Sequence, residues 1–485
     1  HELAKAAENL EIALELDEHS LDDLIHKPGT GNSLVQWLEL IESTTTLKEK
    51  FLKHLVSTRN SLHFQWCNVS PSCMQMLCEY FTDRLEELSF IHTIDMAEIV
   101  KIVIQHCHKL KKFSVELNQD LTGADIRCLC EANPDLESIQ LIDCSGFTSE
   151  VLIWVSQLSK LRELVLRGIR WLKGTAKFMY ICSDTLEVLD VGCSNIPTSE
   201  LWFFQPLRKL KKFNAKCCKY LETGIPELVA GLEGLEYVDV SRAYRDTDST
   251  IGALLKQENV IARSVDVSHC KKLTDKGLEY LAELLKTGNL TDIIVSSCCR
   301  VTERGIYSLT RSSGVCNIQV LNLSYNTSLA ESCFSSLLSA LDIERLSSLS
   351  LGRCKIKNTT LQNLLRKDRK LALTCLSIPG TPVEDLSWLF PLTPKLEQLN
   401  VKECPIQDST MLALAKHCPH LTEIDISKCN GLQEASIIEL IRNATNLITL
   451  RMNQCLPVTS RTIVAISDHS RKLQTLEISN NVKIF

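Results

Sequence analysis

The chain has 485 residues, of which 44% are hydrophobic and 23% charged, and its formal net charge is −6. No apolar run approaches the roughly 20 residues that a membrane-spanning helix needs, so we expect no membrane segment. The acidic balance argues against nucleic acid as the main partner, because phosphate backbones require a concentrated basic face. Twenty-two cysteines in a long, apolar-rich chain favour reduced thiols in an intracellular protein, cytoplasmic or nuclear, over a secreted disulfide scaffold.

Residues 1–58 are expected to form a small helical segment of their own. Residues 8–25 and 32–41 have the pattern of helices, and the Pro/Gly turn "HKPGTGN" separates them. A third helix is expected over residues 47–58.

From residue 59 onward one pattern recurs, for example as Leu421, Ile424, Ile426 and Cys429. Its L-x-L alternation places two apolar side chains on one face of a short strand. Later apolar positions lie three and four residues apart, which predicts a helix that packs back against the strand. No such unit can bury its apolar face alone, so the units must stack as an array. We count 17 frames, which start at residues 59, 85, 110, 136, 161, 186, 210, 235, 262, 290, 318, 346, 373, 396, 421, 447 and 473.

A cysteine recurs at the eighth residue after the frame start, which we call the ladder position. Asn118, Asn326 and Asn481 hold it in three other frames. We interpret these side chains as structural, because a small thiol or an amide can bond buried backbone groups where the strand becomes a loop. The nine ladder cysteines are Cys67, Cys144, Cys218, Cys270, Cys298, Cys354, Cys404, Cys429 and Cys455.

We expect the ladder cysteines to be buried, reduced and unligated. No C-x-x-C pair occurs, so we predict neither a metal site nor a cofactor. A serine in place of Cys429 is expected to be poorly tolerated, because a buried hydroxyl needs a partner. Cys107 and Cys418 hold a second recurring place, three residues before a frame start, and are expected to pack between helix end and strand.

The repeated frame, with the continuation "LTDKGL" at residues 273–278, resembles the cysteine-containing class of leucine-rich repeats. F-box/LRR proteins, the substrate receptors of cullin-RING ubiquitin ligases, are well-known members of that class. The resemblance covers residues 59–485. It implies an α/β leucine-rich-repeat solenoid, or horseshoe, with parallel strands on the concave face and helices on the convex face.

The function that the resemblance implies is a non-catalytic protein-interaction module, the substrate-recognition part of a cullin-RING ligase. The alternative is a structural scaffold subunit of a larger assembly, with no role in ubiquitin transfer. Residues 1–58 then have two interpretations: a cap over the open edge of the first repeat, or a docking element for Skp1 or another cullin adaptor. The Leu-Pro opening of an F-box is absent there, so both interpretations stay open.

We predict that the protein is not an enzyme. No nucleophile elbow, H-E-x-x-H motif or Gly-rich dinucleotide turn is present. The aromatic stretches "LWFFQPL" and "LSWLFPL", residues 201–207 and 386–392, fall in the two shortest repeats. We expect their rings to fill the core where a full helix does not fit.

The partner is expected on the concave face, where the second, fourth and sixth residues after each frame start project from the strands. Most of these residues are small or mildly polar, but frames 161 to 235 and their loops are basic and aromatic. Arg, Tyr and Trp dominate binding energy at interfaces, and a basic set suits an acidic or phosphorylated segment of a protein. The alternative is a solvated basic patch with Trp171 packed in the stack. The predicted partner-binding residues are Arg167, Arg170, Trp171, Lys212, Lys216, Tyr237, Arg242, Tyr244 and Arg245.

Overall fold

The computed structural model divides the chain into two compact units, which meet in sequence at Gly224 and Ile225. Most of residues 1–58 lie outside the described part of the chain, so the capping and docking interpretations of that segment stay predictions. The described residues are 52–481, apart from 54–55, 57–58, 66–68, 83, 148–149, 170–183, 197–206, 219–223, 244–246, 258 and 365–369.

In the first unit, every predicted frame forms a strand that begins two residues after the frame start. Each strand pairs in parallel with the next, and residues at equal frame positions lie opposite each other. The strands are β1 (Ser61–Gln65), β2 (Glu87–Ile91), β3 (Lys112–Glu116), β4 (Ser138–Ile142), β5 (Glu163–Arg167), β6 (Val188–Asp190) and β7 (Lys212–Asn214).

The second unit continues the same offset and the same parallel pairing. Its strands are β8 (Tyr237–Asp239), β9 (Ser264–Asp266), β10 (Asp292–Ile294), β11 (Val320–Asn322), β12 (Ser348–Ser350), β13 (Cys375–Ser377), β14 (Gln398–Asn400), β15 (Glu423–Asp425), β16 (Thr449–Arg451) and β17 (Thr475–Glu477). The described residues therefore hold 17 parallel strands, one for each predicted frame.

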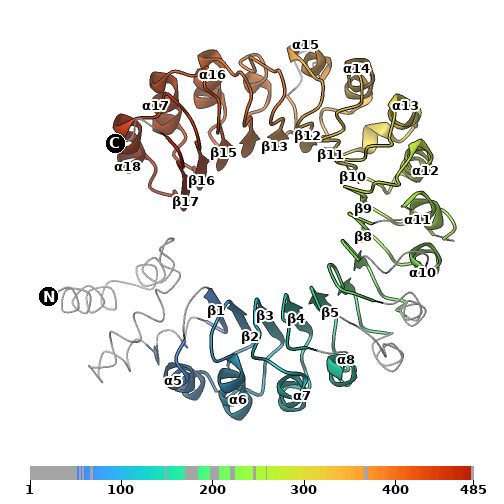
Figure 1. Cartoon of the computed structure of the whole chain (residues 1–485), viewed down its shortest axis with the longest axis vertical. Coiled ribbons are helices and arrows are strands. Elements are labelled where there is room, and N and C mark those ends of the chain that lie inside the picture. Colours follow the sequence, from blue (N-terminus) through green and yellow to red (C-terminus); the bar gives the residue numbers. More distant parts are fainter. Residues whose placement is uncertain are drawn as a thin grey trace. The chain divides into compact units, whose positions relative to one another are not determined.

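Within each unit the strands line the inner side and the helices the outer side (Figure 1). The helices of the first unit are α5 (Pro71–Phe81), α6 (Met96–His106), α7 (Gly123–Ala132) and α8 (Glu150–Val155). Those of the second unit are α10 (Ile225–Gly231), α11 (Thr247–Leu254), α12 (Asp275–Lys286), α13 (Glu303–Arg311), α14 (Glu331–Ala340), α15 (Asn358–Leu361), α16 (Asp408–His417), α17 (Glu434–Asn443) and α18 (Ser460–His469). Short 3₁₀ turns are η2 (Val315–Asn317), η3 (Gln362–Leu364) and η4 (Phe390–Leu392).

The core lies between strand and helix in each repeat, where the frame predicts it. Leu421, Ile424 and Ile426 are fully buried, as are Leu278 and Leu281 on α12. This arrangement of parallel strands and outer helices is an α/β leucine-rich-repeat solenoid, and the predicted fold class is confirmed.

The short repeat at residues 386–392 replaces its helix with the single 3₁₀ turn η4. Leu386, Leu389 and Phe390 are buried there, whereas Trp388 is partly exposed. The prediction that the aromatic rings of this stretch fill the core is therefore confirmed for Phe390 only. Residues 201–206 of the other aromatic stretch lie outside the described residues.

The seventh residue after each frame start, which we call the turn position, has a left-handed backbone in all 16 repeats where it is described. Glycine holds the position only at Gly168 and Gly380, and fourteen other side chains occupy it elsewhere. This conformation costs a non-glycine residue about 1–2 kcal/mol. The N–H at the turn position donates to a carbonyl of the next repeat, as from Lys428 to Asn453 at 2.9 Å. Fourteen of these repeats have this bond, which offsets the strain there.

A second set of bonds links the starts of neighbouring helices. The first residue of α12, Asp275, accepts bonds from the backbone and hydroxyl of Thr302 at 2.7 and 2.6 Å. Asp248 receives the same two bonds from Thr274 at 3.0 and 2.5 Å. The Thr–Asp pair in "LTDKGL" is therefore a contact between repeats, with Thr facing the previous helix and Asp the next one.

Candidate functional site

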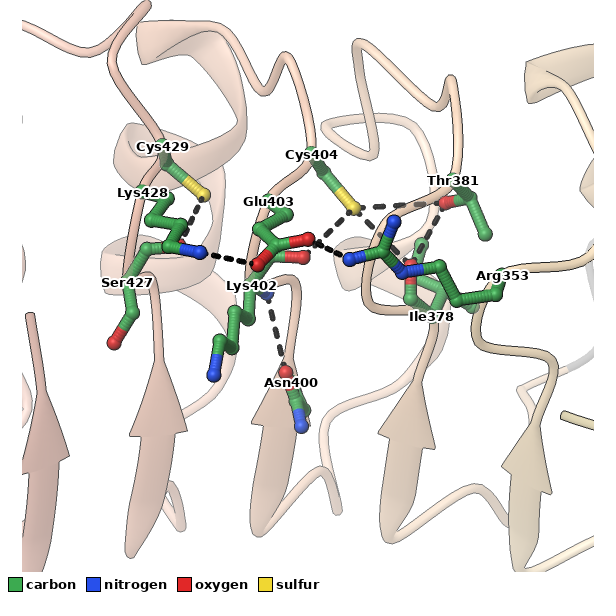
Figure 2. Close-up of polar contacts among 10 residues, drawn as sticks. All are labelled: Arg353, Ile378, Thr381, Asn400, Lys402, Glu403, Cys404, Ser427, Lys428 and Cys429. Carbon is green, nitrogen blue, oxygen red and sulfur yellow. Dashed lines mark hydrogen bonds and ion pairs between the residues drawn. The ribbon is translucent and has the colours of Figure 1, made fainter. Parts of the chain in front are cut away.

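The ladder cysteines that the structure describes are buried and form no disulfide. Each thiol donates to a carbonyl of the preceding repeat, always that of the fifth residue after the frame start. Cys404 bonds Ile378, Cys429 bonds Val401 and Cys455 bonds Ile426, each at 3.1 Å. Figure 2 shows two of these thiols above the strand ends. Cys67 lies outside the described residues.

Burial raises the pKa of these thiols, which keeps them protonated and able to donate. The pKa of Cys298, Cys354 and Cys429 rises to about 12 because burial disfavours the thiolate. A thiol of that kind is a poor nucleophile and a poor metal ligand. The ladder thus serves to join repeats. Among the described residues, no group of three or more His, Cys, Asp or Glu side chains is placed to hold a metal ion.

Three hydroxyl residues that the sequence analysis missed also occupy the ladder position, namely Thr93, Ser194 and Thr381. Ser194 donates to the Leu166 carbonyl at 2.6 Å and accepts from the backbone of Ile169. Thr381 donates to the Ile378 carbonyl at 2.8 Å. Thr93 is buried as well, but its hydroxyl has no hydrogen-bond partner among the described residues. A hydroxyl at this position is therefore paired in two repeats and unpaired in a third, and serine at Cys429 is expected to cost little only where it finds a carbonyl as Ser194 does. A search of the eighth place after each frame start for Ser and Thr, as well as Cys and Asn, would have found all three.

The second cysteine place also lies inside the fold. Cys107 and Cys418 are buried directly after α6 and α16, between helix end and strand as predicted. The Cys418 thiol contacts the carbonyl of Thr393 at 3.5 Å.

The nine predicted partner-binding residues are only partly described. Arg167, Lys212 and Lys216 belong to the first unit, and Tyr237 and Arg242 belong to the second. The other four, Arg170, Trp171, Tyr244 and Arg245, lie outside the described residues. The five described side chains are half-exposed or exposed. That all nine residues form a single binding surface stays a prediction.

Arg167 is engaged within its own unit. Its guanidinium donates to Asp190 at 2.5 Å, and Asn214 donates to the same carboxylate at 3.0 Å. The bond to Asp190 raises the pKa of Arg167. This side chain therefore has a structural role across three adjacent repeats, and it stays 43% exposed toward solvent.

The second unit carries a charged rim that the sequence analysis missed. The rim consists of Arg353, Glu403 and Lys428, all at turn positions (Figure 2). Glu403 forms ion pairs with Arg353 and, at 2.8 Å, with Lys428. The bond from Lys428 lowers the pKa of Glu403, and the charge of Arg353 lowers it further.

Arg353 reaches Glu403 across an intervening repeat because that repeat has glycine at its turn position. A Cβ on Gly380 would lie 2.5 Å from the Nε of Arg353. The missing side chain lets the guanidinium lie over this backbone. The sequence signal for this ion pair was a glycine, Gly380, at the turn position between those of Arg353 and Glu403.

Comparisons with known proteins agree with the fold. A family model described as "Leucine Rich repeat" matches residues 263–282 and 417–435. The matched segments lie in the repeats of β9 and β15 and agree with the repeat pattern of the fold. None of the described helices is long and apolar enough to cross a membrane.

Solved structures similar to this chain include three of different origin. An internalin from Listeria monocytogenes is 19% identical over 80% of this chain and 95% of its own, with a TM-score of 0.40. The yeast Rad7–Elc1 complex is 12% identical over 99% and 90%, with a TM-score of 0.42. The leucine-rich-repeat ectodomain of the Arabidopsis thaliana receptor kinase GASSHO1/SCHENGEN3 is 14% identical over 84% and 48%, with a TM-score of 0.42. Likenesses at this level carry no argument about function.

Proposed function

We propose that the protein is a non-catalytic module that recognises another protein through the open face of its parallel strands. The supporting observation is the alternation along each strand. In β12, Leu349 is buried while Ser348 and Ser350 on either side are partly exposed. The same alternation recurs in most strands of the second unit. Strands about 4.8 Å apart make its ten-strand face about 43 Å long, enough for about a dozen extended residues.

The role that we propose for this module is substrate recognition in a cullin-RING ubiquitin ligase of the F-box/LRR type. Support comes from the cysteine-containing repeat, whose ladder recurs along both units, and from the resemblance that this repeat carries. Residues 1–58 would then dock Skp1 or another cullin adaptor, and the protein would act inside the cell. The nine residues from Arg167 to Arg245 are our proposed contacts for the substrate. The alternative function is a scaffold subunit that holds an assembly together.

Binding of purified chain to immobilised Skp1–cullin complex tests this role. We expect the whole chain to bind and a variant without residues 1–58 to lose binding, with the circular dichroism of the solenoid unchanged. A double variant, Lys216→Ala with Tyr237→Ala, is the matched control and should bind the adaptor normally, since both residues are proposed substrate contacts and both are exposed. No binding by the whole chain would reject the ligase role and favour the scaffold. A deletion variant that binds but unfolds earlier would make residues 1–58 a cap.

A further inference from the structure

A depression of about 590 Å³ lies next to the charged rim, within the second unit. The loops that follow β11, β12 and β13 form it. Its charged side chains are Arg353, Lys355, Lys357 and a single acid, Glu331. Three positive charges against one negative make this place basic on a chain whose net charge is −6. We call it the basic depression.

The acid in the basic depression is already occupied by neighbouring groups. One oxygen of Glu331 accepts the hydroxyl of Thr360 at 2.5 Å, and the other lies 3.5 Å from the ammonium of Lys357. In the part of the chain that the structure describes, Lys355 has no ion-pair partner and its side chain is exposed. Lys357 and Arg353 are engaged with Glu331 and Glu403, whereas the charge of Lys355 is balanced by no ion pair among the described residues.

Arg353 also keeps donors for a ligand. A guanidinium has five N–H donors, and the rim contact to Glu403 is made through one nitrogen, Nη2. The Nε lies over the bare backbone of Gly380, which lines the depression together with Pro382. Because Gly380 has no side chain, the depression stays open beside this donor.

An exposed aromatic ring stands one repeat before Arg353. Tyr325 holds the turn position of its own repeat and is 53% exposed. Its backbone N–H donates to the Gly352 carbonyl at 2.6 Å, which fixes the loop that carries the ring. Tyrosine and arginine in adjacent repeats are the residue types that contribute most at protein interfaces.

We propose that the basic depression, together with Tyr325 one repeat before Arg353, is a docking site for an acidic segment of a partner protein. Carboxylate or phosphate groups of the segment accept bonds from Arg353, Lys355 and Lys357, and its chain packs against Tyr325. The proposal rests on the proposed function only in taking the partner to be a protein. A nucleic acid is the less suitable occupant, because three cations in one depression cannot follow a phosphate backbone.

Fluorescence anisotropy of the whole purified chain with labelled nine-residue peptides tests the proposal. One peptide alternates Gly with Glu, a second replaces Glu by Gln, and a third replaces Glu by phosphoserine. We expect the Glu peptide to bind at least about tenfold more tightly than the Gln peptide, as charge-assisted bonds require. The phosphoserine peptide, compared with the Glu peptide, shows which anion the site prefers. No ubiquitin component is present, so failure here and failure of adaptor binding are separate results.

Paired variants locate the site. Lys355→Glu with Lys357→Glu should weaken the Glu peptide about tenfold or more, while Glu331→Gln should strengthen it about two- to fivefold by removing the one acid. The control is Lys271→Glu with Lys272→Glu, which makes the same change in charge in another strand-to-helix loop of this unit. Lys271 holds the same place in its frame as Lys355, and both control residues are exposed.

Three results would overturn the proposal. The first is equal weakening by the two double variants, which would mean only general charge attraction. The second is equal binding of the Glu and Gln peptides. The third is tighter binding of a nine-nucleotide RNA than of either acidic peptide, which would assign the depression to nucleic acid. Circular dichroism of each variant checks that the solenoid is intact.

Discussion

Replacement of Cys429 tests whether the ladder thiols stabilise the array in the way that their contacts indicate. Cys429 is fully buried, and its thiol donates to the Val401 carbonyl at 3.1 Å. Alanine would remove one weak hydrogen bond, about 0.5–1 kcal/mol, and leave a cavity of about one methyl group, about 1 kcal/mol. The Val401 carbonyl keeps its bond from the Cys404 N–H, so no unsatisfied group adds to the loss. We expect Cys429→Ala to lower the free energy of unfolding by about 2 kcal/mol at pH 7.

Serine at this position should be less harmful than alanine. The hydroxyl would have the Val401 carbonyl as acceptor, as Ser194 has the Leu166 carbonyl. We expect Cys429→Ser to lower the free energy of unfolding by about 1 kcal/mol, mostly from burial of the more polar group.

The pH dependence separates burial of the thiol from packing alone. The pKa of Cys429 is about 12 in the folded protein, against 9.0 for an ordinary thiol. Between these values the unfolded chain releases the proton and the folded chain retains it, so stability falls as pH rises above 9. At pH 10 this thiol lowers the stability of the unmodified protein by about 1.4 kcal/mol. Neither variant has this proton to lose, so at pH 10 the deficit of Cys429→Ala should shrink to about 0.6 kcal/mol, and Cys429→Ser should become more stable than the unmodified protein by about 0.4 kcal/mol.

Urea unfolding followed by circular dichroism, in reducing buffer at pH 7 and pH 10, measures these differences. Cys316→Ala is the control, because Cys316 is exposed and its loss should change stability at neither pH. A deficit for Cys429→Ala that is the same at both pH values would refute the argument that burial holds the thiol protonated. No deficit at pH 7 would show that the ladder contact contributes nothing.

Two further predictions concern other parts of the second unit. Gly314→Ala would place a Cβ 1.9 Å from the carbonyl oxygen of Leu285, so we expect a loss of about 1–3 kcal/mol in unfolding free energy. Gly431→Ala, whose nearest contact would be 3.3 Å, should change it little, and equal losses would contradict the steric reason. Glu403→Gln should cost less than about 1 kcal/mol at pH 7, since its partners are at the surface. Lys428 holds the pKa of Glu403 below its usual 4.5, so this stabilisation is present above pH 4.5 and is lost as pH falls below it. A difference between Glu403→Gln and the unmodified protein that does not shrink as the pH is lowered stepwise below 4.5 in the same urea assay would show that the ion pairs are not its source.

The number and places of the strands could be predicted because one physical requirement recurs in every repeat. Each frame must bury its L-x-L pair, and a shift by one residue would turn both leucines toward solvent. Leu421, Ile424 and Ile426 illustrate this, and every strand begins at the same offset from its frame. The short 3₁₀ repeat at residues 386–392 followed from the same reasoning, since a step of 23 residues leaves no room for a full helix.

The turn position and the rim could not be predicted, because they depend on contacts between repeats. Fourteen of the residues with a left-handed backbone at the turn position are not glycine, so residue type gave no signal. The hydrogen bond that stabilises this backbone is made to a carbonyl of the next repeat. The reach of Arg353 to Glu403 depends on a side chain that is missing from Gly380. The partner-binding prediction was based on residue types in frames 161 to 235. Ion pairs within the protein decide which charged side chains can still bind a partner, as the pair of Arg167 with Asp190 shows.

The two-way bonding of each loop has a consequence for how the length of such a protein can change. At Cys429 the thiol bonds backward to Val401, and at Lys428 the N–H bonds forward to Asn453. Neighbouring repeats have the same kinds of donor and acceptor toward the preceding repeat and toward the next one. If one whole repeat were deleted between equivalent points, the newly adjacent loops would present matching donors and acceptors. Partial deletions would leave both sets unmatched, so genetic exchange in such a chain is expected to preserve whole repeats.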